Sequence, residues 1–317
     1  MHLAYAFGRA VLPDHTAKFS RKDFTLPQLF ACLVVREMLR LSYRKAQAFF
    51  RDSAGWLAEI GIKKPPDHNT LWRAFGVICT LRRLNRMLDL QAELFRCAGR
   101  LELDRQPLAA DSTCYEQRHR SRHYERRCRK IGLPPGGKFG RQTAVSADKS
   151  RSREHRRMPK LALAGAAACH AVLSARVHIG SGSDAPDFSP LLRDACRRAP
   201  VRTVVADSGY DSEANHQFAR RELRVRSIIP PHAGRPSDKP PTGYWRRHMR
   251  RRFDRRADQR LYSQRAQAET INSMLKRNLG DELRSRLKAR RKAEMVLRTV
   301  VHNIMLAGNL DTNPSRG

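Results

Sequence analysis

The segment VRTVVADSGYDSEANHQFARRELRVRSIIP (residues 201–230) combines a strand, a turn, a helix and a second strand in close succession. The β-branched run at 201–206 ends in small and acidic residues, which favour a turn. SEANHQFARREL then predicts a helix, and VRSIIP is typical of a short strand. Strands that alternate with helices predict an α/β layer in which helices cover both faces of a sheet.

The rest of the C-terminal part continues this pattern. QPLAADST (106–113) and KLALAGAAACHAVLSARVHIGSG (160–182) predict strands, and the second stretch divides into two. DFSPLLRDACRRA (187–199) and YSQRAQAETINSMLK (262–276) predict helices. RKAEMVLRTVVHNIMLAG (291–308) predicts a final amphipathic helix that packs on this core.

The sequence before residue 100 predicts helices alone. FTLPQLFACLVVREMLRLSYRKAQAFFRD (24–52) suggests two helices with a break near Ser42, and the run after the proline pair at 65–66 suggests a long helix capped by Asn69 or Thr70. We therefore expect an all-helical N-terminal domain in residues 1–100 and a larger domain in residues 101–317. The helical domain could place a helix in the major groove of DNA, or serve as a scaffold or dimer surface.

Positive charge dominates the composition of this 317-residue chain. It has 63 Lys and Arg residues against 30 Asp and Glu residues, which gives a formal charge of +33. Such a field attracts polyanions, and 40% hydrophobic residues argue against a disordered chain. Two Arg-, Gly- and Pro-rich intervals, near residues 116–159 and 231–258, lack apolar periodicity and predict basic insertions or loops.

Several classes of protein are excluded by what the sequence lacks. No apolar stretch approaches the ~20 residues that span a bilayer, so we expect no membrane association. Seven cysteines without a C-x2-C pair do not suit a secreted disulfide framework. No G-x-S-x-G turn or P-loop is present. We expect a cytoplasmic protein.

Three acidic residues follow elements that could bring them together. Asp111 and Asp207 each end a predicted strand, and Glu269 lies on the predicted helix 262–276. An isolated Asp at a strand end is usually a turn former, and a helical Glu usually faces water. Together, however, three carboxylates offer the oxygen ligands with which two Mg²⁺ ions cut or join a phosphodiester.

The spacing Tyr262-x2-Arg265-x3-Glu269-x6-Lys276 resembles the Y-x2-R-x3-E-x6-K signature of insertion-sequence transposases of the IS4/IS5 type. The blocks DSTCYEQRHRSRHYERR, ADSGYDSEANHQFARREL and RSIIPPHAGRP are similar to those that carry the first and second catalytic acids in that family. The resemblance extends over most of the chain and is looser before residue 100.

This resemblance implies an RNase H-like catalytic fold in residues 101–317, a mixed sheet flanked by helices, with a basic insertion before the last catalytic helix. Asp111, Asp207 and Glu269 would form its DDE triad and bind two Mg²⁺ ions, with Mn²⁺ able to substitute. Such an enzyme binds the terminal inverted repeats of its element, cleaves there and joins the freed 3′-hydroxyls to target DNA as a homodimer. We expect it at the bacterial nucleoid.

The resemblance also assigns DNA contacts to residues around the triad. Arg265 and Lys276 would hold backbone phosphates, and Tyr262 would hydrogen-bond or stack at the same DNA end. On a helix, the spacing puts these residues and Glu269 on one face. The alternative for Arg265 is an i,i+4 ion pair with Glu269 on a solvated helix.

Each basic insertion holds a further candidate. Trp245 could stack on a flipped base or, as the sequence favours, anchor the second insertion to the domain. The arginines beside it are assigned to the DNA backbone: Arg246, Arg247 and Arg250. In the first insertion, CYEQRHRSRHYERRC (114–128) holds two cysteines and two histidines, but without a C-x2-C pair we favour phosphate contacts over zinc.

Two other functions stay open from the sequence. A catalytically inactive or domesticated DNA-binding regulator would explain the charge, but it does not require all three acids. A metal-dependent nuclease or resolvase on the same fold would cleave DNA without strand transfer, so joined products distinguish it from a transposase.

Overall fold

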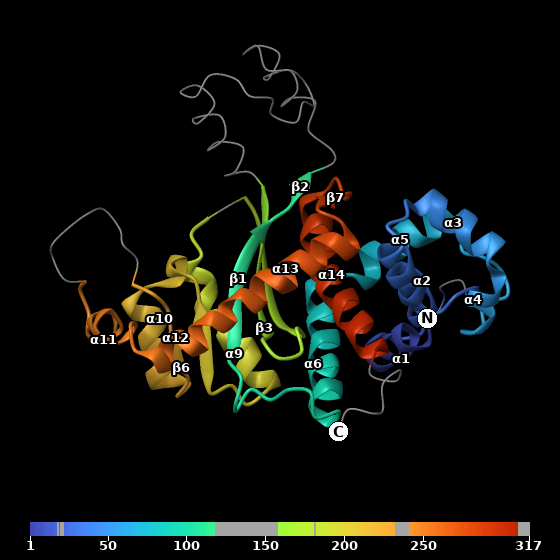
Figure 1. Cartoon of the computed structure of the whole chain (residues 1–317). Coiled ribbons are helices and arrows are strands. Elements are labelled where there is room, and N and C mark those ends of the chain that lie inside the picture. Colours follow the sequence, from blue (N-terminus) through green and yellow to red (C-terminus); the bar gives the residue numbers. More distant parts are fainter. Residues whose placement is uncertain (18, 20–21, 118–157, 181, 232–240, 310–317) are drawn as a thin grey trace, which may run out of the picture.

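The computed structural model describes residues 1–17, 19, 22–117, 158–180, 182–231 and 241–309 of the chain. In Figure 1, N-terminal helices lie beside a sheet, and the last helix lies against both. Most of the first basic insertion is outside the described residues, and so are three of its four candidate zinc ligands. Among the described helices, none is long and apolar enough to cross a membrane.

Helices alone form the described part of the first hundred residues, as predicted. The break near Ser42 is confirmed, because the Ser42 hydroxyl accepts a hydrogen bond from the Lys45 N–H and starts a new helix. Asp67, and not Asn69 or Thr70, caps the helix after the proline pair, since Asp67 has the extended backbone that a cap needs. The elements are α1 (His2–Val11), α2 (Leu26–Met38), α3 (Tyr43–Asp52), α4 (Ala54–Ala58), α5 (His68–Ile78) and α6 (Leu81–Cys97).

The long helix predicted after residue 66 is two helices, α5 and α6. Thr80 separates them, and its hydroxyl accepts a hydrogen bond from the Arg83 N–H at 3.3 Å. The apolar pattern continues across this break, so hydrophobic periodicity alone does not reveal it.

A five-stranded mixed sheet forms the centre of the C-terminal part. Its order is β4-β3-β1-β5-β6, in which β1 pairs antiparallel with β3 and parallel with β5. The hairpin β3–β4 confirms that the stretch 160–182 divides into two strands. The strands are β1 (Leu108–Cys114), β3 (Pro159–Ala166), β4 (Val172–Ile179), β5 (Thr203–Ala206) and β6 (Arg226–Ile228), while β2 (Glu116–Gln117) pairs with β7 (Glu282–Leu283).

Helices cover both faces of this sheet. Because side chains alternate along a strand, Ala162 and Ala164 of β3 face α9 (Ala185–Arg198), whereas Leu161 and Leu163 face the other side. On that side lie α13 (Ala266–Leu279) and α14 (Lys288–Gly308), with α12 (Arg256–Tyr262) further along the sheet. The predicted α/β architecture, a mixed sheet flanked by helices, is confirmed.

Two predictions about the segment before α13 are wrong in part. The second insertion, predicted over residues 231–258, is helical in α11 (Tyr244–Arg252) and again from Arg256, where α12 begins, instead of being a loop. The burial of Met249 and the hydrogen bond from the Trp245 N–H to Glu213 hold α11 in place. The signature segment 262–276 is also not one helix. Tyr262 ends α12, a 3₁₀ turn spans Ser263–Arg265, and α13 begins at Ala266.

One hydrophobic core crosses residue 100. It joins α2 and α5 to α13 and α14, and buried charges cross the same contact: Arg298 of α14 donates to Glu37 of α2 at 3.1 Å. Arg298 also pairs with Glu294, and its guanidinium donates to the Gly280 carbonyl. The division into domains at residue 100 stays a prediction, and the core shows that both sides are packed together.

Candidate active site

Of the two acids predicted at strand ends, Asp207 directly follows β5, but Asp111 lies inside β1, which continues to Cys114 because it stays paired with β3 there. Ala110 of β1 is paired with Ala206 of β5, so Asp111 and Asp207 follow equivalent positions on adjacent strands. Ala109 packs in the cluster on the α13 side of the sheet, and Asp111, two residues later on β1, is directed to that side. The fold therefore brings these two predicted triad members beside each other, at the point where the pairing of β1 with β5 ends.

The third acid, Glu269, lies on α13, which packs against β1 and β3. Ala268, beside it, packs in the cluster that contains Ala109. Gly165 of β3 permits the close approach of the helix, because a Cβ atom at Gly165 would lie 2.5 Å from the Ile271 side chain. The packing of α13 on the sheet thus sets the position of Glu269 relative to Asp111 and Asp207.

Arg265 contacts one of the three acids and acts electrostatically on the other two. Its guanidinium forms an ion pair with Glu269 at 2.7 Å, the alternative that the sequence offered for this pair. Burial lowers the pKa of Arg265, but Tyr262, Glu269 and Asp207 outweigh burial and raise the pKa overall. Arg265 also lowers the pKa of Asp111. A single cation is therefore in electrostatic reach of the whole predicted triad.

Asp111 is half-buried and has a specific neighbour that sequence reasoning missed. Burial raises the pKa of Asp111, while the Ser112 N–H, Asn272 and Arg265 act against burial. The Asn272 amide nitrogen donates to Asp111 Oδ2 at 2.9 Å. Asn272 follows Glu269 by three residues, a helical spacing that could have pointed to a shared face.

These residues are of the type that binds a metal ion, but they are not arranged as a complete set of ligands around one position. Within the described ranges, no group of three or more His, Cys, Asp or Glu side chains stands ready to hold a metal. Glu269 is instead bound to Arg265. Carboxylate oxygens are the ligands that Mg²⁺ and Mn²⁺ prefer, and the Glu269 side chain is 55% exposed and thus unrestrained by the core.

A buried lysine braces the loop next to Asp111. Ser112 donates to Asp184 Oδ1 at 2.7 Å, and Lys160, itself 3% exposed, contacts Asp184 and Asp187 at 3.0 Å each. Because the lysine is paired twice, its burial is compensated. These contacts hold the part of β1 beside Asp111 against the start of α9.

The remaining signature residues flank this site along α13. Tyr262 lies with its ring centroid 5.9 Å from the Arg265 guanidinium carbon. Lys276, two turns beyond Glu269, lies with its Nζ 5.7 Å from the centre of the Tyr115 ring. Arg265 contacts both Tyr262 and Glu269, so the 3₁₀ turn does not separate these side chains.

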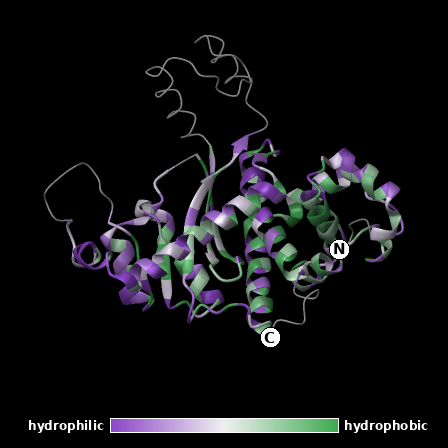
Figure 2. Ribbon diagram, viewed as in Figure 1, coloured by the Kyte–Doolittle hydropathy of each residue, from purple (hydrophilic) through white to green (hydrophobic). Residues whose placement is uncertain are grey.

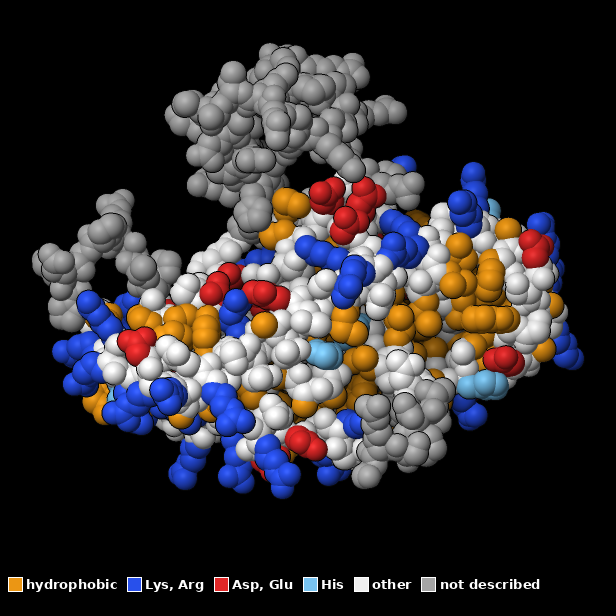
Figure 3. All heavy atoms as spheres, in the orientation of Figure 1, with side chains coloured by type: hydrophobic (Ala, Val, Ile, Leu, Met, Phe, Trp, Pro, Cys, Tyr) orange, Lys and Arg blue, Asp and Glu red, His pale blue; other side chains and the backbone are white. Residues whose placement is uncertain are grey.

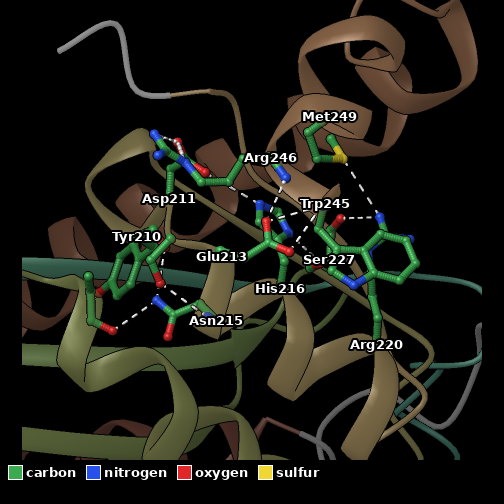
Figure 4. A network of polar contacts seen from close by, with 12 residues as sticks. Tyr210, Asp211, Glu213, Asn215, His216, Arg220, Ser227, Trp245, Arg246 and Met249 are labelled. Carbon is green, nitrogen blue, oxygen red and sulfur yellow. Dashed lines mark hydrogen bonds and ion pairs between the residues drawn. The ribbon is translucent and has the colours of Figure 1, made fainter. Parts of the chain in front are cut away.

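Trp245 and Arg246 hold α11 against the rest of the protein. Glu213 accepts hydrogen bonds from the backbone N–H groups of both residues, at 3.1–3.2 Å, and so caps the helix (Figure 4). Arg246 pairs with the buried Asp211 at 2.8 Å, and the Arg220 guanidinium lies 4.7 Å from the Trp245 ring centroid. The contacts favour the anchoring alternative for Trp245.

The outer side of the same segment carries unpaired positive charge. Arg247 and Arg250 are exposed and form no ion pair within the described chain, and exposed arginines continue through α12. The segment is hydrophilic in Figure 2, and Lys and Arg side chains gather at this end of the molecule in Figure 3. A polyanion on this surface would lead towards Arg265, because α12 continues into the turn before α13.

Comparison with known families covers the region that holds these residues. Residues 102–304 match the family model described as transposase DDE domain, a region that contains the whole sheet and all three acids. No curated protein and no solved structure matches the chain. The match spans well over half of the sequence, and the chain therefore belongs to the transposase DDE domain family.

Proposed function

We propose that this protein is the transposase of an IS4/IS5-type insertion sequence, which binds the terminal inverted repeats, cleaves the ends and transfers the 3′-hydroxyls to target DNA. One observation carries the proposal: Asp111 of β1 and Asp207, directly after β5, occupy neighbouring positions on the side of α13, and Arg265, in electrostatic reach of both, pairs with Glu269 on that helix. The net charge of +33 supports DNA as the substrate.

Asp111, Asp207 and Glu269 would hold two Mg²⁺ ions, or Mn²⁺ in their place, which would activate the attacking oxygen and stabilise the leaving oxygen. Binding by all three acids requires Glu269 to leave Arg265. The arginine is then free to pair with a backbone phosphate, the contact its guanidinium suits best. Lys276 would bind a second phosphate along α13, and Tyr262 would contact the same DNA end.

The basic insertion would supply further phosphate contacts. We assign Arg247 and Arg250 to this role because both are exposed, whereas Arg246 and Trp245 would act through the position of α11. Pairing of two ends calls for a homodimer in the synaptic complex. We place the protein in the cytoplasm, at the nucleoid.

Cleavage of a DNA fragment that carries the end of the element tests this function. With Mg²⁺, the wild-type chain should cut at the end and form joined products. Asp207→Ala should abolish cutting while it still retains DNA in a mobility-shift assay. Asp104→Ala is the matched control, because Asp104 is exposed and precedes β1, at the opposite end from Asp111.

Three outcomes separate this function from its alternatives. Cutting that survives in Asp207→Ala would defeat the proposed chemistry. Cutting without joined products would identify a nuclease. Retention of the end fragment without any cutting by the wild-type chain would identify a DNA-binding regulator.

A further inference from the structure

We propose that Asn272 is a fourth side chain of the metal site, which donates its amide hydrogen to Asp111 and offers its amide oxygen to the cation as a direct ligand. This inference rests on the proposed function. Asn272 lies outside the Y-x2-R-x3-E-x6-K spacing and is not an acid, so sequence reasoning did not identify it as a metal ligand.

The position of the Asn272 side chain is fixed on one side. Its nitrogen donates to Asp111 Oδ2 at 2.9 Å, and the residue is only 6% exposed. The amide orientation follows from the chemistry, because a carboxylate accepts hydrogen bonds and would repel the amide oxygen. Glu269 and Asn272 thus lie one turn apart on α13, and the Asn272 side chain in turn contacts Asp111.

The oxygen of the amide has no hydrogen-bond partner in the part of the chain that the structure describes. Asn272 Oδ1 is buried, and within the described residues no donor reaches it. A buried oxygen that accepts nothing forfeits its hydration without compensation, and native proteins rarely retain such groups. The oxygen belongs to the same amide as the nitrogen that touches Asp111, so a partner for it would stand close to the predicted metal site.

A divalent cation satisfies this oxygen in a way that fits its chemistry. Hard cations such as Mg²⁺ accept amide oxygens together with carboxylates. A neutral fourth ligand also avoids placing another negative charge beside Asp111, whose pKa burial already raises. Asn is therefore better suited to this position than a fourth acid.

Metal binding to the full-length chain tests the inference first. Mn²⁺ affinity, measured by electron paramagnetic resonance titration without DNA, should fall about tenfold or more in Asn272→Ala, the loss typical when a partner of a metal site is removed. Asn278→Ala, on the exposed side of the same helix, should match the wild type. Equal affinity in Asn272→Ala and the wild type would overturn the inference.

A spectroscopic test separates direct ligation from support of Asp111. Asn272→Cys places its sulfur at the position of the amide carbon. Because a metal–thiolate bond is longer than a metal–oxygen bond, added Cd²⁺ should produce a thiolate-to-cadmium absorption beyond that of the wild-type chain. Asn278→Cys should add none. Absence of the extra absorption in Asn272→Cys, with the chain folded by circular dichroism, would show that residue 272 does not touch the metal and would overturn the inference.

Failure of the underlying function is recognised separately. Asp207→Asn should lose Mn²⁺ affinity in the same titration. If the wild type and Asp207→Asn bind Mn²⁺ equally, the proposed triad is wrong. If Asp207→Asn loses binding and Asn272→Ala does not, the triad stands and only the role of Asn272 falls.

Discussion

At the scale of single residues, Arg265 occupies the position in which a cation is expected. Its guanidinium pairs with Glu269 at 2.7 Å and is in electrostatic reach of Asp111 and Asp207. A metal ion bound as proposed would therefore compete with the arginine for Glu269. If the arginine then moves to a DNA phosphate, as proposed, it should have opposite effects on metal binding and on catalysis.

Arg265→Gln should separate these two effects. Without the competing cation, Mn²⁺ should bind the DNA-free chain a few-fold more tightly, in line with the ~1 kcal/mol upper value for a partly exposed ion pair. Cleavage of the end fragment should fall, because a phosphate contact is lost. Titration with Mn²⁺ and a cleavage assay measure the two quantities, with Arg277→Gln as the control at the exposed end of α13. Weaker Mn²⁺ binding by Arg265→Gln would refute the competition.

The predictability of the site also differs residue by residue. Asp111, Asp207 and Glu269 were identified from a resemblance, and the fold then places the first two beside each other, Asp111 inside β1 and Asp207 directly after β5. The ion pair of Arg265 with Glu269 was one of two alternatives, since spacing does not say which partner a guanidinium takes. Asn272 was missed, because an unpaired buried oxygen exists only in three dimensions.

At the scale of elements, the contact of α13 with the sheet decides where Glu269 stands. Gly165→Ala should weaken this contact, because the added Cβ atom would lie 2.5 Å from Ile271 Cδ1 and 3.1 Å from the Ala171 carbonyl oxygen. We expect a loss of about 1–3 kcal/mol in the free energy of unfolding, typical of overpacking, together with slower cleavage. Chemical denaturation measures the loss.

The control for this change is Gly55→Ala, since a Cβ atom at Gly55 would contact nothing within 4 Å. Its stability should equal or exceed that of the wild type, because alanine favours a helix. A Gly165→Ala chain as stable and active as Gly55→Ala would show that the close approach of α13 is not needed.

The attachment of α11 gives a second prediction at this scale. Arg246→Gln leaves Asp211, which is fully buried, without its arginine, and we expect a loss of up to about 3 kcal/mol, the low end for a buried pair, because His216 also faces Asp211. Protease cleavage should then concentrate in α11 and α12. Arg247→Gln, on the exposed side of α11, should leave the digestion pattern unchanged. Equal protection of α11 in both variants would contradict the anchoring role.

Elements were predicted where their own residues determine them. The hairpin of β3 and β4, the helix α9 and the strand before Asp207 follow from local apolar patterns, and all three are confirmed. α11 was missed because Glu213, some thirty positions earlier, caps it. The 3₁₀ turn before α13 was missed because it interrupts the helix without changing the order of side chains along its surface.

At the scale of the whole molecule, charge should govern how the protein meets DNA. With a formal charge of +33 and an arginine-rich end, many phosphates would be neutralised at once. If six or more are, affinity should fall by about a thousandfold or more between ~50 and ~200 mM salt. Arg247→Gln and Arg250→Gln together should reduce the slope of log K against log salt by about two.

The matched control removes two charges elsewhere. Arg202 and Arg221 are exposed, and Arg202 directly precedes β5, at the end of the strand away from Asp207. Arg202→Gln with Arg221→Gln should leave the slope unchanged. An affinity that hardly varies with salt, or equal slopes for the two double variants, would argue against phosphate binding by α11.

The packing of the whole chain could be predicted less well than its division into a helical part and an α/β part. The sequence separated a helical part from an α/β part, and both are present, but the single core that joins α2 to α14 was not foreseen. The Arg298–Glu37 pair explains why, since it connects residues more than 250 positions apart. No local pattern announces such a contact.

If Asp111, Asp207 and Glu269 meet around bound metal, as proposed, iron-directed cleavage of the protein backbone should reveal their proximity in solution. Fe²⁺ replaces Mg²⁺ at oxygen-ligand sites, and with ascorbate and peroxide it cuts the chain where the metal lies. We predict cuts next to all three acids, suppressed by excess Mg²⁺ and lost together in Asp207→Asn. Cuts beside only one acid, or an unchanged pattern in Asp207→Asn, would contradict the account.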